Sequence, residues 1–302
     1  MLAYFLIRLC CAERLGSIKF YSNIRLFRSL CLPPPPPPPV LRNFDLSHKI
    51  ILINDAATYP GAAIAARLHR AGAVICLAGA YRHELAALAE SLGRDKNKIE
   101  ILDFDCIDPH AVARAVDYMG IKFGRLDGLV NNIFKKLSGA DSPDIEDFEN
   151  CYKCNVNPIF DLSQKCIPLL QKADGSNISC IVNIASIYGM ISPEALIDKG
   201  TGLSNQPFYA ASHAEIIQLT KHFSAHFISS GIRTNTVSLG IVPSASALSD
   251  NPDLFERLRQ QIPMKRIGYA EEVAAAVHFL LSDDAMYING INMPVDGGWT
   301  AC

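Results

Sequence analysis

The chain has 302 residues, of which 49% are hydrophobic and 19% charged, so it is long enough for one large domain with a well-buried core. Its 28 basic and 30 acidic residues nearly cancel, which argues against nucleic acid or an anionic membrane as a partner. Small molecules and sister subunits are the expected partners. The ten cysteines lack the spacing of a disulfide framework or a metal site, which favours reduced thiols in a cytoplasmic protein without a metal. The one close pair in the domain, Cys151 and Cys154, is interpreted as helix cysteines.

The first 45 residues are predicted to lie outside the folded domain. Residues 1–32 carry five basic residues against a single glutamate, and seven consecutive prolines follow at 33–39. Proline runs adopt an extended polyproline II helix with about 3.1 Å per residue, which predicts a spacer of roughly 20 Å. The basic segment is compatible with an organelle-targeting leader, a membrane-surface helix or an extension with no function of its own. It contains no apolar stretch long enough to span a bilayer.

From residue 46 onward, short apolar runs alternate with helix-like segments. Strands are expected at 49–54, 73–78, 99–103, 126–131, 180–184, 233–238 and 291–295. Helices are expected at 62–71, 109–123, 155–170, 209–229 and 270–281. Alternating strands and helices build parallel crossover units. The order therefore predicts a single α/β domain over residues 46–302, a doubly wound parallel sheet (Rossmann fold) with helices on both faces.

Five segments of this domain resemble the short-chain dehydrogenase/reductase family, and the resemblance covers essentially all of residues 46–300. The segments are GRLDGLVNN, IVNIASIYG, GIRTNTVSLG, EEVAAAVHFLLSD and MPVDGGWT. In this family a Tyr-x-x-x-Lys pair on one helix works with an upstream serine and with an asparagine on an earlier helix. The chain matches these three residues at Tyr209, Ser186 and Asn155, but His213 stands where the family has lysine.

The resemblance implies a hydride-transfer enzyme that interconverts a carbonyl and an alcohol. Tyr209 would exchange the proton, Ser186 would polarise the carbonyl, and Asn155 would hold a water for proton relay. Residues four apart share one face of a helix, so Tyr209 and His213 are expected side by side. The family's lysine stabilises tyrosinate by its charge and holds the nicotinamide ribose. Because a histidine is mostly neutral at pH 7, His213 predicts a slow or pH-shifted enzyme.

The turn after the first strand departs most from the family, which there has Thr-Gly-x-x-x-Gly-x-Gly. In that motif backbone amides approach the cofactor pyrophosphate. The matching run here, NDAATYPG, contains five candidate cofactor contacts: Asn54, Thr58, Tyr59, Pro60 and Gly61. Asp55 brings a carboxylate toward the phosphates, and like charges about 4 Å apart cost on the order of 4 kcal/mol at an effective dielectric near 20. Tyr59 brings a ring that either blocks the backbone or packs on the adenosine, and Thr58 keeps a hydroxyl for phosphate.

Four more candidate cofactor contacts follow from the resemblance: Asp105, Asn131, Gly240 and Val242. Asp105 matches the acid that holds the adenine amino group, and Val242 lies in the stretch that meets the nicotinamide amide. Asn131 begins the family's Asn-Asn-Ala-Gly motif. The two small residues of that motif are replaced here by Ile133 and Phe134, next to the expected nicotinamide ribose.

The residues at the end of the second strand bear on the choice between NADP and NAD. NAD-preferring members usually end the second strand with an acid that binds the ribose hydroxyls, whereas this chain has Gly79 there. NADP-preferring members often place a basic residue next, and here Ala80 follows, with Arg82 two positions on. This pattern weakly favours NADP over NAD. Arg82 as a solvated arginine at the start of a helix is the alternative.

The 22 residues between Ser186 and Tyr209 form a longer stretch than the family usually has. Its SIYG start, a Pro-Glu pair and an Asn-x-Pro before the tyrosine resemble the subgroup linked to flagellin and surface-polysaccharide sugar biosynthesis. That resemblance implies a polar, carbohydrate-like substrate. Long loops at an active-site mouth are more often functional than accidental, and a plain surface insertion is the alternative.

Two functions from different classes remain open. One is an NAD(P)-dependent oxidoreductase that acts on a carbonyl or alcohol such as a sugar derivative. The other is a catalytically impaired homologue that keeps the fold as a binding or assembly subunit. Departures at cofactor contacts favour the second, namely Asp55, Tyr59, Ile133, Phe134 and His213. The intact Asn155, Ser186 and Tyr209 favour the first, and the prediction leans to an enzyme. A homo-oligomer, either a dimer or a tetramer, is expected under both.

Overall fold

The computed structural model describes residues 44–93, 96–133, 144–171, 178–192 and 207–302. The basic segment and the proline run lie outside these residues. So do Phe134 and residues 193–206, which form most of the long stretch before Tyr209 and contain most of the pattern on which the predicted sugar-related subgroup depends.

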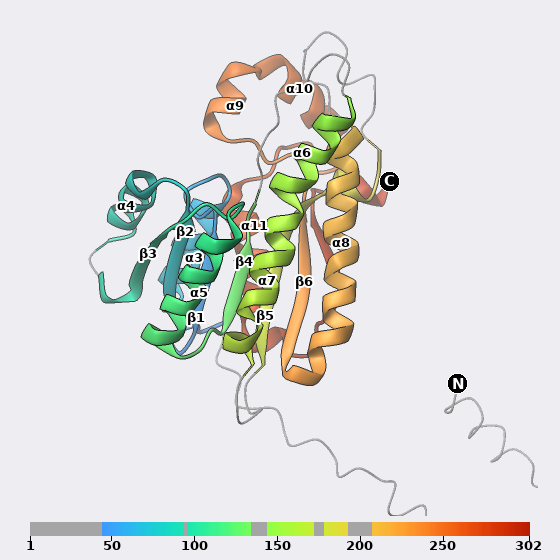
Figure 1. Ribbon diagram of the computed structural model, residues 1–302. Helices are drawn as coiled ribbons and strands as arrows, with labels where there is room; N and C mark the ends of the chain where they lie inside the picture. The colour runs from blue at the N-terminus through green and yellow to red at the C-terminus, as the bar shows by residue number, and fades with distance from the viewer. Residues whose placement is uncertain (1–43, 94–95, 134–143, 172–177, 193–206) are drawn as a thin grey trace, which may run out of the picture. The chain divides into compact units, whose positions relative to one another are not determined.

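Seven parallel strands form one sheet in the order β3-β2-β1-β4-β5-β6-β7 (Figure 1). The strands are β1 (Ile50–Asn54), β2 (Val74–Gly79), β3 (Ile99–Asp103), β4 (Gly128–Asn131), β5 (Ser179–Ser186), β6 (Ile232–Leu239) and β7 (Asn292–Val295). The chain runs outward from β1 to β3 and then returns to pair β4 with β1. Ligands of such sheets bind at the carboxyl ends of the strands, beside this change of direction. The predicted doubly wound parallel sheet is confirmed.

Helices cover both faces of the sheet. They are α3 (Gly61–Arg70), α4 (Arg82–Ser91), α5 (Pro109–Phe123), α6 (Ile145–Asn155), α7 (Asn157–Leu170), α8 (Pro207–Phe227), α9 (Ala245–Asp250), α10 (Pro252–Gln261) and α11 (Ala270–Leu281). In Figure 1, α5, α7 and α8 lie in front of the sheet, whereas α3 and α11 lie behind it. Side chains alternate between these layers along β1, so that Leu52 belongs to the front core and Ile51 and Ile53 to the rear core.

The helices differ from the prediction in the start of one helix and in the presence of three additional helices. The expected helix 155–170 is wrong at its start, because α6 ends at Asn155 and α7 begins at Asn157. Pro158 lies in the first turn of α7, where its missing N–H costs nothing, but it interrupts any helix that runs through from α6. Three helices were not expected at all: α4, α9 and α10. These are short and bury few side chains, so their sequences carry little apolar periodicity.

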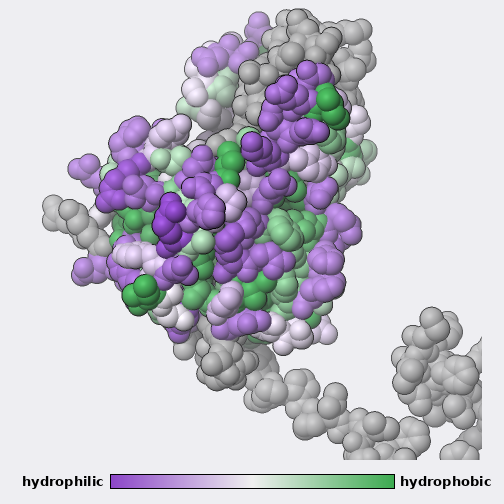
Figure 2. All heavy atoms as spheres, viewed as in Figure 1, coloured by the Kyte–Doolittle hydropathy of each residue, from purple (hydrophilic) through white to green (hydrophobic). Residues whose placement is uncertain are grey.

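The surface in Figure 2 mixes hydrophobic and hydrophilic side chains over the face that α5, α7 and α8 cover. Ile121 of α5 is 87% exposed and Phe160 of α7 is 48% exposed. Single exposed apolar residues are normal on a soluble surface, so the expected homo-oligomer stays a prediction. Among the helices of the folded domain, none is long and apolar enough to cross a membrane.

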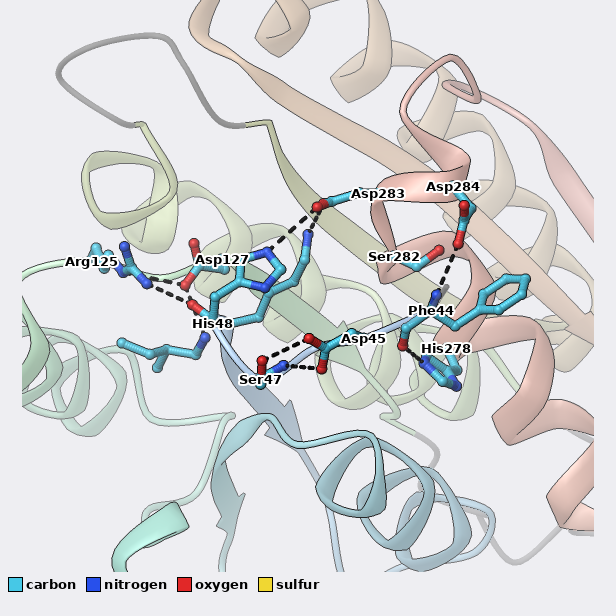
Figure 3. A network of polar contacts seen from close by, with 12 residues as sticks. Phe44, Asp45, Ser47, His48, Arg125, Asp127, His278, Ser282, Asp283 and Asp284 are labelled. Carbon is cyan, nitrogen blue, oxygen red and sulfur yellow. Dashed lines mark hydrogen bonds and ion pairs between the residues drawn. The ribbon is translucent and has the colours of Figure 1, made fainter. Parts of the chain in front are cut away.

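Polar contacts attach the entry segment, residues 44–50, to the rest of the domain (Figure 3). Lys49 is only 5% exposed and forms an ion pair with Asp283, with 2.6 Å between Nζ and Oδ1. The amide of Phe44 donates to Asp284 at 3.0 Å. Packing of the domain therefore includes Phe44, which the sequence had assigned to the extension.

His278 of α11 connects the entry segment to α3. Its Nε2 donates to the carbonyl of Phe44 at 2.6 Å, and its Nδ1 accepts from Nε of Arg67 at 3.1 Å. The contact with Arg67 requires the neutral ring, because a proton on Nδ1 would face the N–H of Arg67. Burial lowers the pKa of His278, helped by the Arg67 charge, and the hydrogen bond to Phe44 acts the other way.

Replacing His278 with glutamine is expected to make the domain less sensitive to acid. The folded protein holds a neutral His278 with a lowered pKa, whereas the unfolded chain takes up the proton near pH 6.5. Stability from this residue is therefore present above pH 6.5 and is lost as pH falls below it. His278→Gln offers one donor and one acceptor but cannot titrate. Thermal unfolding at pH 7.5 and 5.5 should show a smaller loss of Tm for the variant than for the wild type, and an equal loss would contradict this account.

Candidate active site

Ser186, Tyr209 and His213 meet at the carboxyl end of the sheet. Ser186 is the last residue of β5, and the other two lie one turn apart on α8. The hydroxyls of Ser186 and Tyr209 are hydrogen-bonded. The rings of Tyr209 and His213 are 4.4 Å apart between centroids and meet edge to face. All three side chains line one cavity of about 180 Å³. The structure thus brings together the serine, the tyrosine and the histidine that the sequence singled out.

A short 3-10 helix, η2 (Ile187–Gly189), sets the distance between Ser186 and α8. A Cβ on Gly189 would lie 2.7 Å from the backbone carbon of His213 and 2.8 Å from the amide nitrogen of Ala214. Such contacts are too close for any side chain, so only glycine lets η2 approach α8. Sequence reasoning quoted this glycine within SIYG but gave it no role. Its importance depends on a contact between segments far apart in the chain.

Asn155 does not line the cavity. It is buried at the end of α6, and its amide donates to the sulfur of Cys151 at 3.6 Å. The Cys151 thiol in turn donates to the carbonyl of Phe208 and to the hydroxyl of Ser212, both at 3.6 Å. Asn155 therefore reaches α8 through Cys151. The role of Asn155 in holding a water stays a prediction.

The close cysteine pair lies in α6, as expected. All seven cysteines within the folded domain are free thiols, and Cys151 is buried whereas Cys154 is half-buried. No cluster of three histidine, cysteine or acidic side chains in this part of the chain has the arrangement of a metal site. Cys151 thus packs α6 against α8.

The electrostatics of the cavity keep both ring side chains uncharged. Burial lowers the pKa of His213 to about 4, so the ring is neutral at pH 7. Burial also raises the pKa of the Tyr209 phenol, the hydrogen bond from Ser186 opposes this, and Cys151 adds to the rise. No positive charge of His213 is thus available at neutral pH to favour tyrosinate.

The turn between β1 and α3 is tied to the end of β4 by Asn132. The side-chain amide of Asn132 donates to the carbonyl of Asp55 and to the hydroxyl of Thr58, both at 3.1 Å. A Cβ on Gly61 would lie 2.6 Å from the same amide nitrogen, which explains why this glycine is kept. Asn54 is fully buried below the turn and accepts from the amide of Asp55 at 3.1 Å. Sequence reasoning did not assign Asn132 this role.

The same turn retains backbone donors suited to a phosphate. Within the folded domain, the amides of Ala57, Tyr59 and Gly61 donate to no protein acceptor. They lie at alternate positions leading into the first residue of α3, and free amides at a helix N-terminus favour an anion. Pro60 is the N-cap residue of α3 and has no amide hydrogen to offer. The Thr58 hydroxyl donates to the carbonyl of Asp55 at 2.8 Å and so first serves the turn itself.

Tyr59 narrows the side of the cavity where these amides lie. Its ring lines the cavity and is 39% exposed, and its hydroxyl is hydrogen-bonded to the backbone of Ala270 at the start of α11. Burial raises the pKa of Tyr59 to about 12, Glu271 adds to the rise, and the Ala270 contact opposes it. A cavity of about 180 Å³ is smaller than the roughly 300–1,000 Å³ typical of ligand pockets. The backbone amides beside Tyr59 therefore suit a cofactor phosphate, whereas the Tyr59 ring narrows the space next to them.

Five predicted cofactor contacts do not line the cavity: Asn54, Thr58 and Gly61, which belong to the turn after β1 or its end, and Asn131 and Asp105. Asn131 is fully buried, and its amide donates to Ser163 at 3.1 Å and to Asn183 at 2.8 Å, which holds β4 against β5 and α7. Asp105 is exposed just after β3, and its carboxylate accepts from the amide of Ile107 at 3.0 Å. Asn131 is thus part of the core, while Asp105 remains open to solvent.

Gly240 and Val242 line the same cavity as Tyr59. A Cβ on Gly240 would lie 2.5 Å from the Cα of Asp296, so glycine is needed for β6 to pass the end of β7. Val242 also borders a second cavity of about 510 Å³, and it is the only predicted residue there. Although it is larger, this second cavity contains none of the acid-base side chains.

Comparison with known proteins identifies the family of this chain. The family described as enoyl-(acyl carrier protein) reductase matches residues 61–300. The chain is 31% identical over 261 residues to D-threitol dehydrogenase of Mycolicibacterium smegmatis, an alignment that covers 85% of this chain and 95% of the relative. It is 29% identical over 255 residues to meso-2,3-butanediol dehydrogenase of Serratia marcescens, covering 84% and 95%. The chain belongs to the short-chain dehydrogenase/reductase family.

Solved structures of the family share the fold. The RhlG–NADP active-site complex of Pseudomonas aeruginosa aligns with a TM-score of 0.75 at 26% identity, covering 85% of this chain and 98% of that one. Gluconate 5-dehydrogenase of Burkholderia cenocepacia, in complex with NADP and tartrate, aligns with the same score and identity, covering 86% and 98%. Members of the family are NAD(P)-dependent oxidoreductases of alcohols and carbonyls. The resemblance to the family is therefore confirmed, and the sugar-biosynthesis subgroup stays a prediction.

Proposed function

We propose that this chain is an NAD(P)-dependent oxidoreductase that interconverts an alcohol and a carbonyl. The observation that carries the proposal is the hydrogen bond between Ser186 and Tyr209 on the wall of the cavity. A phenol and a hydroxyl converging on one point suit the carbonyl oxygen of a substrate. The relatives support this chemistry, since those named above are dehydrogenases.

A nicotinamide bound beside Gly240 and Val242 would supply or accept the hydride. In the direction of reduction, the Tyr209 hydroxyl gives its proton to the carbonyl oxygen while the Ser186 hydroxyl donates a hydrogen bond to that oxygen. In the direction of oxidation, the deprotonated Tyr209 removes the proton of the alcohol. His213 supplies no charge at neutral pH, because its pKa is lowered to about 4. Reduction, which starts from the neutral phenol, is therefore favoured over oxidation at pH 7.

The substrate proposed is a secondary alcohol or the matching ketone. Relatives of this chain are named for polar substrates such as D-threitol and 2,3-butanediol, and also for a steroid alcohol. A carbohydrate-like substrate agrees with the first two names. We propose that the protein works as a homo-oligomer through the helices that carry Asn155 and Tyr209.

A second candidate function is a catalytically impaired homologue that serves as a binding or assembly subunit. Two observations favour it: the neutral His213 in place of a lysine, and the Tyr59 ring at the phosphate side of the cavity. Both bear on cofactor contacts and neither disturbs the fold. This candidate predicts an intact domain that turns over no alcohol or ketone.

Thermal unfolding with NADH, NADPH and adenosine monophosphate distinguishes the two functions before any substrate is chosen. A ligand at 100 times its dissociation constant adds about 2.7 kcal/mol of stability. For a domain of this size each kcal/mol raises Tm by roughly 2–4 °C, so a shift of about 5–10 °C is expected with a dinucleotide. Adenosine monophosphate, which lacks the nicotinamide half, should give a smaller shift. The second function is supported if neither dinucleotide shifts Tm, no cyclic ketone of a test panel is reduced and no diol or polyol of that panel is oxidised.

A further inference from the structure

The carboxylate of Asp55 lies beside Gly79, at the end of β2. A Cβ built on Gly79 would lie 4.0 Å from Oδ1 of Asp55 and 3.4 Å from a methyl carbon of Leu85. The amide of Ala56 donates to the carbonyl of Ala78 at 2.9 Å, which holds the turn after β1 against the end of β2. The sequence prediction placed this carboxylate against the phosphates. In the structure it occupies the space that a short side chain on residue 79 would reach.

The backbone of Asp55 favours this placement. Its φ of 51° lies in the left-handed region, which aspartate and asparagine tolerate better than most residues. The turn is then held by the contacts of Asn132 and Thr58 with the Asp55 carbonyl. The direction of the Asp55 side chain is thus set by a hydrogen-bonded turn.

The first basic residue after Gly79 in the sequence is engaged elsewhere. Arg82, on which the weak preference for NADP depended, forms an ion pair with Asp103 at the end of β3, with 2.8 Å between NH1 and Oδ1. Both side chains are largely exposed, so the pair adds little stability. Its effect is to direct the Arg82 guanidinium toward β3 and to balance its charge.

A carboxylate at this position attracts the free ribose hydroxyls of NAD and repels the ribose phosphate of NADP. Two adjacent ribose hydroxyls can both donate to one carboxylate, which accepts at two oxygens. A phosphate on the same ribose carries a charge of about −1.5 to −2 and is repelled by that carboxylate. We propose that Asp55, reaching from the neighbouring strand, binds the adenosine ribose hydroxyls and makes this chain select NAD over NADP. The inference rests on the proposed function, and it reverses the preference that the sequence suggested.

Direct titration of the full chain with NADH and NADPH, followed by nucleotide fluorescence, tests this role without turnover. The wild type should bind NADH at least about tenfold more tightly than NADPH. Asp55→Asn keeps the shape and tolerates the left-handed backbone but removes the charge, so the preference should fall about tenfold. Arg82→Ala is the matched control. It removes the positive charge at the start of α4, close to Gly79 in the sequence, and should leave the ratio of the NADH and NADPH dissociation constants unchanged.

Three outcomes contradict the inference in distinguishable ways. Tighter binding of NADPH by the wild type overturns it and leaves the oxidoreductase intact. An unchanged ratio in Asp55→Asn, or a selective loss of NADPH binding in Arg82→Ala, overturns the role of Asp55 in the same way. If neither nucleotide binds to the wild type or to either variant, the inference and the proposed function fail together.

Discussion

Replacing Tyr209 with phenylalanine is expected to lower kcat for ketone reduction about 10²- to 10⁴-fold, the range typical for loss of a general acid. The phenol is the group that gives up the proton, and the edge-to-face contact with His213 does not require its hydroxyl. NADH should therefore bind nearly as tightly as before. Steady-state kinetics with a small panel of ketones measures kcat, and a fluorescence titration measures the dissociation constant of NADH.

Tyr188→Phe is the matched control for this substitution. Tyr188 lies on η2, and its ring is 6.4 Å from that of Tyr209 between centroids. It does not line the catalytic cavity, so loss of its hydroxyl should change kcat by no more than about threefold. Equal losses in the two variants, or a Tyr209→Phe variant as fast as the wild type, would show that the proton comes from elsewhere.

Periodicity in the sequence predicts those elements whose side chains are buried on a regular face. The bounds of β3, α5 and α11 agree at both ends with the expectation. These segments bury apolar residues at the spacing of a strand or a helix. By contrast, α10 buries only Leu254 and Leu258, and the polar remainder carries no such pattern. Elements that lie over the core were therefore found, and elements at its rim were missed.

Some residues of the site could likewise be predicted from the sequence, and others could not. Tyr209 and His213 lie one helical turn apart, so their contact could be predicted from local spacing. Ser186 was placed by its resemblance to a family motif. The roles of Gly189 and Asn132 could not be predicted, because each depends on the approach of a segment distant in the chain. These roles arise from tertiary packing and have no local signal.

At Asp55 the residue type alone does not predict what the side chain does to the cofactor. From the sequence, an acid in the phosphate turn predicts repulsion of the cofactor. In the structure a left-handed backbone at this residue goes with a carboxylate that lies beside Gly79. The same charge then lies where an acid aids selection. The φ angle of Asp55, which the residue pattern does not specify, goes with the position beside Gly79 and not with the position against the phosphates.

Replacing His213 with lysine is expected to raise the rate of alcohol oxidation at pH 7 about 10- to 100-fold, since each unit by which the phenol pKa falls is worth about 1.4 kcal/mol. Burial raises the pKa of Tyr209, and the neutral His213 does nothing to lower it. A positive charge at this position favours tyrosinate. Oxidation, which needs the deprotonated phenol, should then rise with pH at a lower pH than in the wild type. The pH profile of kcat/KM from pH 6 to 10 measures this shift.

His213→Gln separates the charge from the shape of the side chain. Because the pKa of His213 is lowered to about 4, the wild-type ring is neutral throughout pH 6–10, and glutamine should leave the profile in place. The introduced lysine has to be charged in a buried position, so His213→Lys should also lower Tm relative to His213→Gln. A lysine variant that folds and binds NADH but shows the wild-type profile would mean that the missing charge does not limit this enzyme. A glutamine variant that loses its activity would instead show that the imidazole itself takes part in proton transfer.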